Sequence, residues 1–256
     1  MKIPIVMAAF GTTTRAMKTY SFINNICKQG FPDHEILWAY SSRMVRDFSK
    51  KKRNTNMRLP HEVLAELREK GHSWAVVQSL HLMCGHEFCR LVEEVSDCDI
   101  RTSVGLPLLF SPEDYLAVSN AIRPMLSGRG DEAIVLVGHG TDHPSWACYV
   151  ALSHMLAETF GQGVYMGVVE DGYPSREMII AEVRKAGFAK VRLLPFMLIA
   201  GVHFAKDLMG DEDSWKTAFE REGIAVSAES KGLGFHEGIV DIFCNHVSEA
   251  MDVIPR

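Results

Sequence analysis

An apolar run that ends in a glycine turn restricts the fold of this chain more than any other feature of the sequence. Residues 133–137 read Ala-Ile-Val-Leu-Val and lead directly into Gly138-His139-Gly140-Thr141. Such a run is typical of a strand buried on both faces of a parallel sheet. Ligands bind at the carboxyl ends of such strands, so His139 stands where a functional side chain is expected. A histidine packed in the turn and bonded only to backbone is the alternative.

Strand-like and helix-like patterns alternate along the whole chain. The expected strands cover residues 3–10, 35–40, 73–82, 100–105, 133–138, 164–169, 191–200 and 225–229. The expected helices cover residues 14–26, 60–70, 88–95, 145–160, 175–186, 214–222 and 236–251, and one more begins at Ser111. This alternation predicts an α/β fold in which parallel sheets are covered by helices on both faces.

Two pairs of short segments indicate that the chain contains two similar halves. Val6–Thr12 can be aligned with Val135–Thr141, and Leu80–Phe88 with Phe196–Phe204. The two matches occur in the same order, and each includes a glycine turn. The alignment places Phe10 on His139 and Glu87 on His203. Each match alone is weak evidence, but together they favour an internal duplication.

The strongest linker signal lies at Ser127-Gly-Arg-Gly130, between the two halves. We therefore expect two similar Rossmann-like domains, residues 1–128 and residues 129–256, with a ligand cleft between them. The last helix could pack back on the first half.

Composition argues against several classes of partner. The chain has 256 residues, a net charge of −5 and a pI of about 6.1, which does not favour a nucleic-acid partner. No apolar run approaches the roughly 18 residues that span a bilayer, so no membrane partner is expected. The apolar N-terminal stretch runs into Gly11-Thr12 as a first strand would, so we expect no signal peptide and a cytoplasmic location. Neither GxxxxGK[ST] nor GxGxxG occurs, so no nucleotide is expected.

Four side chains with metal-binding or proton-transfer chemistry stand at expected strand ends. His139, Glu170 and His203 come from the second half, and Glu87 comes from the first. Two imidazoles with one or two carboxylates suit a divalent Co, Ni, Fe or Zn ion. A closed structural zinc site would more often use cysteine, so we expect an open site that passes its metal on. Taken singly, each residue could instead be a core histidine or a solvated loop glutamate.

A basic segment follows the second expected strand directly. It contains Arg43, Arg46, Lys50, Lys51, Lys52, Arg53 and Arg58. The lysine run is typical of a solvated surface. Arg43 and Arg46 lie nearest the strand end, where a guanidinium could bind a carboxylate through two hydrogen bonds. A small molecule with several carboxylates could bind to these positively charged side chains.

Short motifs spread over nearly the whole chain match one family of enzymes. They are Phe10-Gly-Thr12, Ser42-Arg43, Val77-Gln-Ser-Leu-His81, Gly85-x-Glu87-Phe88, Gly138-His-Gly-Thr141 with His143-Pro144, Val169-Glu170 before Gly172-Tyr-Pro174, Met197-Leu-Ile-Ala-Gly-x-His203, Gly210-Asp-Glu-Asp-Ser-Trp215 and Lys231-Gly-Leu-Gly234. With them the chain resembles the anaerobic cobalt chelatases of the CbiK type, class II chelatases that insert Co(II) into sirohydrochlorin in cobalamin synthesis. The motifs of the second half are the more specific ones.

The resemblance implies two similar α/β domains that hold a tetrapyrrole between them. It implies that His139 and His203 bind the metal, that Glu170 is the glutamate of the metal site, and that Glu87 is the first-half acid facing the metal. The chain departs from the family pattern at Val202, where many members carry aspartate, at His86, where an acid is usual, and at the inserted Asp171. These departures could alter metal preference or proton handling, and they leave all four candidates in place.

We therefore expect a chelatase that inserts Co(II) without ATP. In this interpretation His139 or Glu87 accepts pyrrole protons, while Phe10, Arg43 and Arg46 contact the sirohydrochlorin. A non-catalytic tetrapyrrole or metal carrier is the alternative, and a metallohydrolase is a third possibility. The sequence leaves open whether Co(II), Fe(II) or Ni(II) is the physiological metal, and whether the protein forms a homo-oligomer.

Overall fold

The chain divides into two compact units, each built on its own parallel sheet. The computed structural model describes residues 2–12, 17–42, 57–127, 130–169 and 172–253. Unit 1 comprises Met1–Phe110 and Glu237–Arg256, and unit 2 comprises Ser111–His236. The two sheets confirm the predicted α/β fold class with parallel strands flanked by helices.

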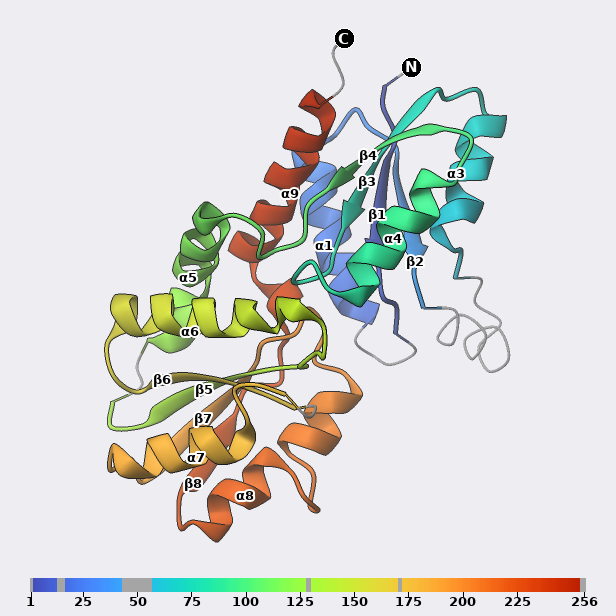
Figure 1. Ribbon diagram of the computed structural model, residues 1–256. Helices are drawn as coiled ribbons and strands as arrows, with labels where there is room; N and C mark the ends of the chain where they lie inside the picture. Colours follow the sequence, from blue (N-terminus) through green and yellow to red (C-terminus); the bar gives the residue numbers. More distant parts are fainter. Residues whose placement is uncertain (1, 13–16, 43–56, 128–129, 170–171, 254–256) are drawn as a thin grey trace. The chain divides into compact units, whose positions relative to one another are not determined.

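Unit 1 contains a four-stranded parallel sheet in the order β2-β1-β3-β4. Its strands are β1 (Ile5–Ala9), β2 (Ile36–Tyr40), β3 (Trp74–Ser79) and β4 (Arg101–Gly105), and its helices are α1 (Met17–Gly30), α3 (Pro60–Glu69), α4 (His86–Ser96) and α9 (Glu237–Asp252). Helices α3 and α4 cover one face of the sheet, while α1 and α9 cover the other (Figure 1). The first of these faces buries Val6, Val77 and Leu64 in one hydrophobic core.

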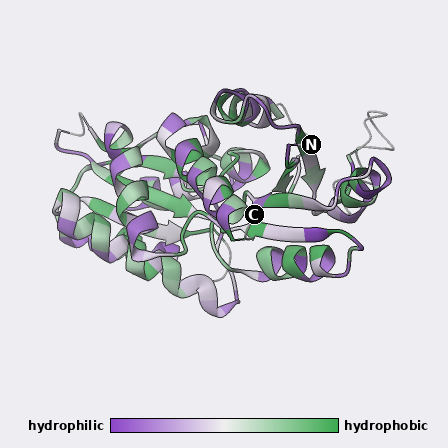
Figure 2. Cartoon of the chain, turned by 90° about the horizontal axis from the view of Figure 1, so that it is seen from above, coloured by the Kyte–Doolittle hydropathy of each residue, from purple (hydrophilic) through white to green (hydrophobic). Residues whose placement is uncertain are grey.

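Unit 2 repeats this arrangement with the strand order β6-β5-β7-β8. Its strands are β5 (Ala133–Gly138), β6 (Val164–Val168), β7 (Lys190–Pro195) and β8 (Ala225–Ala228), and its α-helices are α5 (Pro112–Leu126), α6 (Ala147–Phe160), α7 (Arg176–Lys185) and α8 (Trp215–Arg221). Three short helical turns, η1 (Pro144–Trp146), η2 (Phe204–Leu208) and η3 (Leu233–Phe235), complete it. Helices α5 and α6 lie on one side of the sheet, and α7 and α8 on the other. Apolar residues predominate in the strands, whereas the helices alternate apolar and polar faces (Figure 2).

The same hydrogen bonds recur in both units, which supports the inferred duplication. The backbone N–H of Gly11 donates to the hydroxyl of Tyr20 (3.1 Å), and that of Gly140 donates to the hydroxyl of Tyr149 (3.2 Å). Both pairs are nine residues apart. Both glycines have positive φ, 101° and 94°, where other residues are strained. The duplication therefore extends from the order of the strands to the turn that follows the central strand.

The compact units differ from the expected division at residue 128. Helix α5 follows the first sheet but packs on α6, so it belongs to unit 2. Helix α9 follows the second sheet but packs on α1, β3 and β4 of unit 1, where His246 Nδ1 lies 3.0 Å from the carbonyl oxygen of Leu106. Helix α5 ends at Leu126, directly before the predicted linker, and glycine is common after a helix whether or not a domain ends there.

Two expected strands are shorter than their apolar runs. The run at 73–82 forms a strand only to Ser79, and the run at 191–200 only to Pro195. Leu80 and Phe196, the next residues, remain buried as the chain leaves the sheet. Burial therefore continues past the last strand residue. Among the helices that the structure describes, none combines the length and apolar character that crossing a bilayer demands.

Candidate functional site

The carboxyl edge of the second sheet carries a tightly constrained turn. A Cβ atom on Gly138 would lie 2.4 Å from Cε1 of Tyr149, so only glycine fits at the end of β5. The hydroxyl of the buried Tyr149 accepts a hydrogen bond from the backbone N–H of Gly140. Burial raises the pKa of the Tyr149 hydroxyl above its usual value. Residue 139 is therefore held between two fixed glycines.

His139 projects from this turn and is exposed. Its Nδ1 lies 3.2 Å from the carbonyl oxygen of Gly140. A carbonyl oxygen can only accept, so Nδ1 carries the hydrogen in this contact. In the neutral imidazole the lone pair is then on Nε2, which leaves that nitrogen able to bind a metal.

His203 comes from the segment after β7 and faces His139. The two ring centroids are 4.6 Å apart, with an interplanar angle of 81°. Nδ1 of His203 lies 2.8 Å from Oδ2 of Asp207, and the His203 side chain is 39% exposed. The fold thus brings together two of the predicted site residues, whose imidazoles are 64 residues apart in the sequence.

Glu170, the third predicted metal ligand, lies outside the described residues. The backbone N–H of Val169, directly before it, donates to the carbonyl oxygen of Gly138 (3.0 Å). The described chain therefore runs beside the His139 turn up to residue 169. Across the described ranges, no group of three or more His, Cys, Asp or Glu side chains could hold a metal ion. Arg43 and Arg46 also lie outside the described residues.

Glu87 lies in the first turn of α4 in unit 1, where the helix dipole favours a carboxylate. Its Oε1 accepts a hydrogen bond from Nη1 of Arg90 (2.6 Å), and its Oε2 accepts one from Oγ of Ser41 (3.4 Å). The side chain is 31% exposed. Phe10, the other predicted residue of unit 1, follows β1 and is 43% exposed. Both residues are thus accessible within their own unit.

The comparison with known families decides which group of proteins this is. The sequence profile described as "Cobalt chelatase (CbiK)" matches residues 4–252. The chain belongs to this family.

Two relatives of this CbiK family member span its whole length. The sirohydrochlorin cobaltochelatase of Salmonella typhimurium is 31% identical in an alignment that covers 99% of this chain and 98% of the relative's chain. The sirohydrochlorin cobaltochelatase CbiKC of Nitratidesulfovibrio vulgaris is 30% identical, and the alignment covers 98% of this chain and 91% of the relative's chain. The sirohydrochlorin chelatase SirB of Bacillus subtilis subspecies spizizenii, solved in complex with cobalt, superposes with a TM-score of 0.66 at 17% identity, covering 98% and 96%. This last match supports the fold.

An aromatic pair that sequence reasoning missed stands at the same edge of the second sheet. Trp146 lies in η1, after the β5 turn, and Tyr173 lies after β6. Their rings are 5.7 Å apart and nearly perpendicular, and they are 41% and 46% exposed. Large aromatic surfaces left open beside a strand edge are typical of ligand contacts. The signal in the sequence was their position just after two strand ends.

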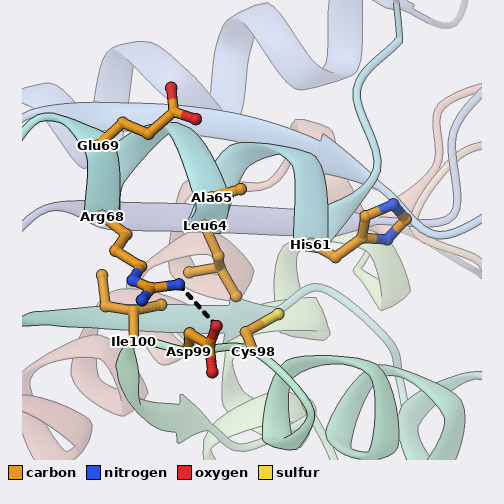
Figure 3. Close-up of a pocket in the computed structure, with 8 residues that line it drawn as sticks. All are labelled: His61, Leu64, Ala65, Arg68, Glu69, Cys98, Asp99 and Ile100. Atoms are coloured by element: carbon orange, nitrogen blue, oxygen red, sulfur yellow. Dashed lines mark hydrogen bonds and ion pairs between the residues drawn. The ribbon is translucent and has the colours of Figure 1, made fainter.

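A pocket in unit 1 lies between α3 and the segment before β4 (Figure 3). Arg68 and Asp99 form an ion pair across it, 2.6 Å between Nη1 and Oδ2. None of the predicted site residues lines it, and its guanidinium is already paired with Asp99. The two histidines remain the better candidate.

Proposed function

We propose that this protein inserts Co(II) into sirohydrochlorin without a nucleotide. The pairing of His139 with His203, in a chain that belongs to the CbiK family, carries this proposal. Two full-length relatives bear the name sirohydrochlorin cobaltochelatase. The substrates are the metal ion and the macrocycle, and the products are the metallated macrocycle and two protons.

In this proposal the metal first binds to Nε2 of His139 and of His203. Both rings have Nδ1 engaged by an acceptor, so both present a lone pair from Nε2. Glu170 is proposed as the third ligand. Few protein ligands leave coordination positions open for the pyrrole nitrogens, which replace the histidines as the metal enters the ring.

Insertion must remove two protons from the pyrrole nitrogens, so the reaction needs a base. We assign this role to Glu87, with neutral His139 as the second acceptor. Arg90 and Ser41 hold the Glu87 carboxylate in place. Exchanging Glu87 for glutamine keeps its shape and removes its charge, so we expect insertion to slow by about 10²–10⁴-fold with the Co(II) affinity unchanged. A variant that inserts Co(II) at the wild-type rate would exclude Glu87 as the base.

The macrocycle must also be oriented, which we assign to side chains of two kinds. Arg43 and Arg46 would pair with its carboxylates, and Phe10, Trp146 and Tyr173 would pack on its apolar surface. Exposure of Phe10, Trp146 and Tyr173 supports this assignment.

The experiment that tests the function is a metal-insertion assay with metal-free sirohydrochlorin. Co(II), Fe(II) and Ni(II) are compared in parallel, without nucleotide, by the change in the absorption spectrum of the macrocycle. We expect turnover above the uncatalysed rate, fastest with Co(II). A protein that binds sirohydrochlorin and Co(II) but completes at most one insertion per molecule would be a carrier, and the proposal would be wrong.

A further inference from the structure

The loop that carries His203 contains one carboxylate, and that carboxylate contacts the histidine. From Ala200 to Leu208 the chain reads Ala-Gly-Val-His-Phe-Ala-Lys-Asp-Leu, so Asp207 is the single acidic residue. Its Oδ2 lies 2.8 Å from Nδ1 of His203, well within hydrogen-bonding distance. Val202, next to the histidine, is 51% exposed and offers no acceptor on its side chain. Asp207 is therefore the one acidic side chain of this loop that contacts the His203 ring.

The backbone at this point holds Asp207 in position. Residues Phe204–Leu208 form a π-helical turn, a geometry that recurs at functional sites. Leu208 is fully buried in the core of unit 2 and anchors the turn. A Cβ on Gly210 would lie 2.2 Å from the carbonyl oxygen of Lys206, so this glycine permits the chain to close tightly behind it. Asp207 is thus a fixed acceptor on an anchored turn.

We propose that Asp207 is the positioning residue of His203 in metal binding. It accepts the Nδ1–H hydrogen bond, fixes the tautomer with the lone pair on Nε2, and orients the ring toward His139. The proposal rests on the metal-binding role given to His203 above. A carboxylate behind a histidine ligand also makes the imidazole a better donor, and loss of such a partner typically weakens metal affinity about 10–100-fold.

A simple surface ion pair is the competing explanation, and it makes a different prediction. Residues four apart on a helical turn often pair, and an exposed pair contributes little to stability. Such a pair would leave the tautomer of His203 and its metal affinity unaffected by the loss of Asp207. Tautomer and affinity are therefore the measurements that separate the two.

The first measurement reads the tautomer in the full-length protein without metal. Long-range ¹H–¹⁵N correlation spectra distinguish Nδ1–H from Nε2–H histidine, and the His203→Gln variant assigns the signal. We expect the Nδ1–H form in the wild type and in Asp207→Asn, whose amide oxygen still accepts. In Asp207→Ala we expect a mixture. An Nε2–H tautomer in the wild type, or an unchanged tautomer in Asp207→Ala, would overturn the proposal.

The second measurement titrates the same proteins with cobalt(II) chloride by calorimetry. We expect Asp207→Ala to bind Co(II) about 10–100-fold more weakly, and Asp207→Asn to lose less. Asp211→Ala is the matched control, because it removes an exposed carboxylate four residues further on. Circular dichroism checks folding. Equal affinities for the wild type and Asp207→Ala would overturn the proposal, whereas failure of the protein to turn over sirohydrochlorin would overturn only the proposed function.

Discussion

At the scale of single residues, the histidines of this protein differ in what surrounds them. His139 and His203 lie at the edge of a sheet and are open to solvent, whereas Nε2 of His81 is buried without a partner among the described residues. Burial lowers the pKa of His81 to about 4. His81 is therefore neutral throughout the neutral range. It follows β3, with Nδ1 2.9 Å from Oγ of Ser79.

His81, whose Nε2 is buried, makes the free energy of unfolding depend on pH. Its pKa is lower in the folded protein than in the unfolded chain, near 6.5, so between these values the unfolded chain binds more protons. The free energy of unfolding should then fall as pH drops from about 6.5 to 4. Between pH 7 and pH 5 this one group contributes a loss of about 2 kcal/mol. Urea unfolding of wild type and His81→Gln at both pH values measures it, and equal pH dependence in the two proteins would contradict the assignment.

Some residues of the candidate site could be predicted from the sequence and others could not. The Gly138-His139-Gly140 turn was predictable because an apolar run ends there, and His203 because it follows another such run. Asp207 was not identified, although the His-x-x-x-Asp spacing is visible in the sequence. The spacing brings the two side chains together only on a helical turn, and no periodic apolar pattern predicts the π-helix at 204–208.

At the scale of elements, the turns after β1 and β5 are each fixed by a tyrosine from the following helix. Tyr149 in α6 holds the turn that carries His139, and Tyr20 in α1 holds the equivalent turn of unit 1. Tyr149→Phe removes the hydroxyl acceptor and leaves the Gly140 N–H without this partner, which typically costs about 1–3 kcal/mol. Tyr20→Phe is the matched control, since it makes the same change at Gly11.

We expect both variants to lower the free energy of unfolding, but only Tyr149→Phe to weaken Co(II) binding. Urea unfolding and calorimetric titration with cobalt(II) chloride measure the two effects. If Tyr20→Phe weakened Co(II) binding as much as Tyr149→Phe, the link between this turn and the metal site would be wrong.

Most elements could be predicted because their local signals agree with the fold. Helix α5 begins as expected, since Ser111 accepts from the N–H of Asp114 (3.2 Å) and Pro112 occupies the first turn. The ends of β3 and β7 were predicted too late, because Leu80 and Phe196 are buried by neighbouring segments after the strand has ended. Burial of that kind depends on tertiary packing, which hydrophobic pattern alone cannot resolve.

At the scale of the whole molecule, the helix that follows each sheet in the sequence belongs to the other unit. Helix α5 follows the first sheet and belongs to unit 2, and α9 follows the second sheet and belongs to unit 1. Helix α9 closes unit 1 although it follows the sheet of unit 2, and it buries Ile239, Val240, Phe243 and Val247. A linker signal reports only local chain flexibility, so it could not reveal which unit a helix joins. The sequence predicted two similar α/β halves divided at residue 128, with a last helix that could pack back on the first half; the compact units have α5 in unit 2 and α9 in unit 1.

This arrangement makes unit 1 depend on the end of the chain. Phe243 is fully buried, and Phe243→Ala should lower the free energy of unfolding by about 3–5 kcal/mol through lost burial and a cavity. Exchanging the exposed Glu249 for alanine on the same helix is the control. Urea unfolding monitored by circular dichroism measures both. A loss below about 1 kcal/mol for Phe243→Ala would show that α9 does not complete the core of unit 1.

The central claim is that His139 and His203 together hold the metal for insertion. The most direct test measures kcat/KM for Co(II) insertion into sirohydrochlorin by His139→Ala and His203→Ala. We expect each variant to lose at least about 100-fold while remaining folded, because each removes one proposed ligand of an open metal site. Near wild-type insertion by either variant would contradict the claim.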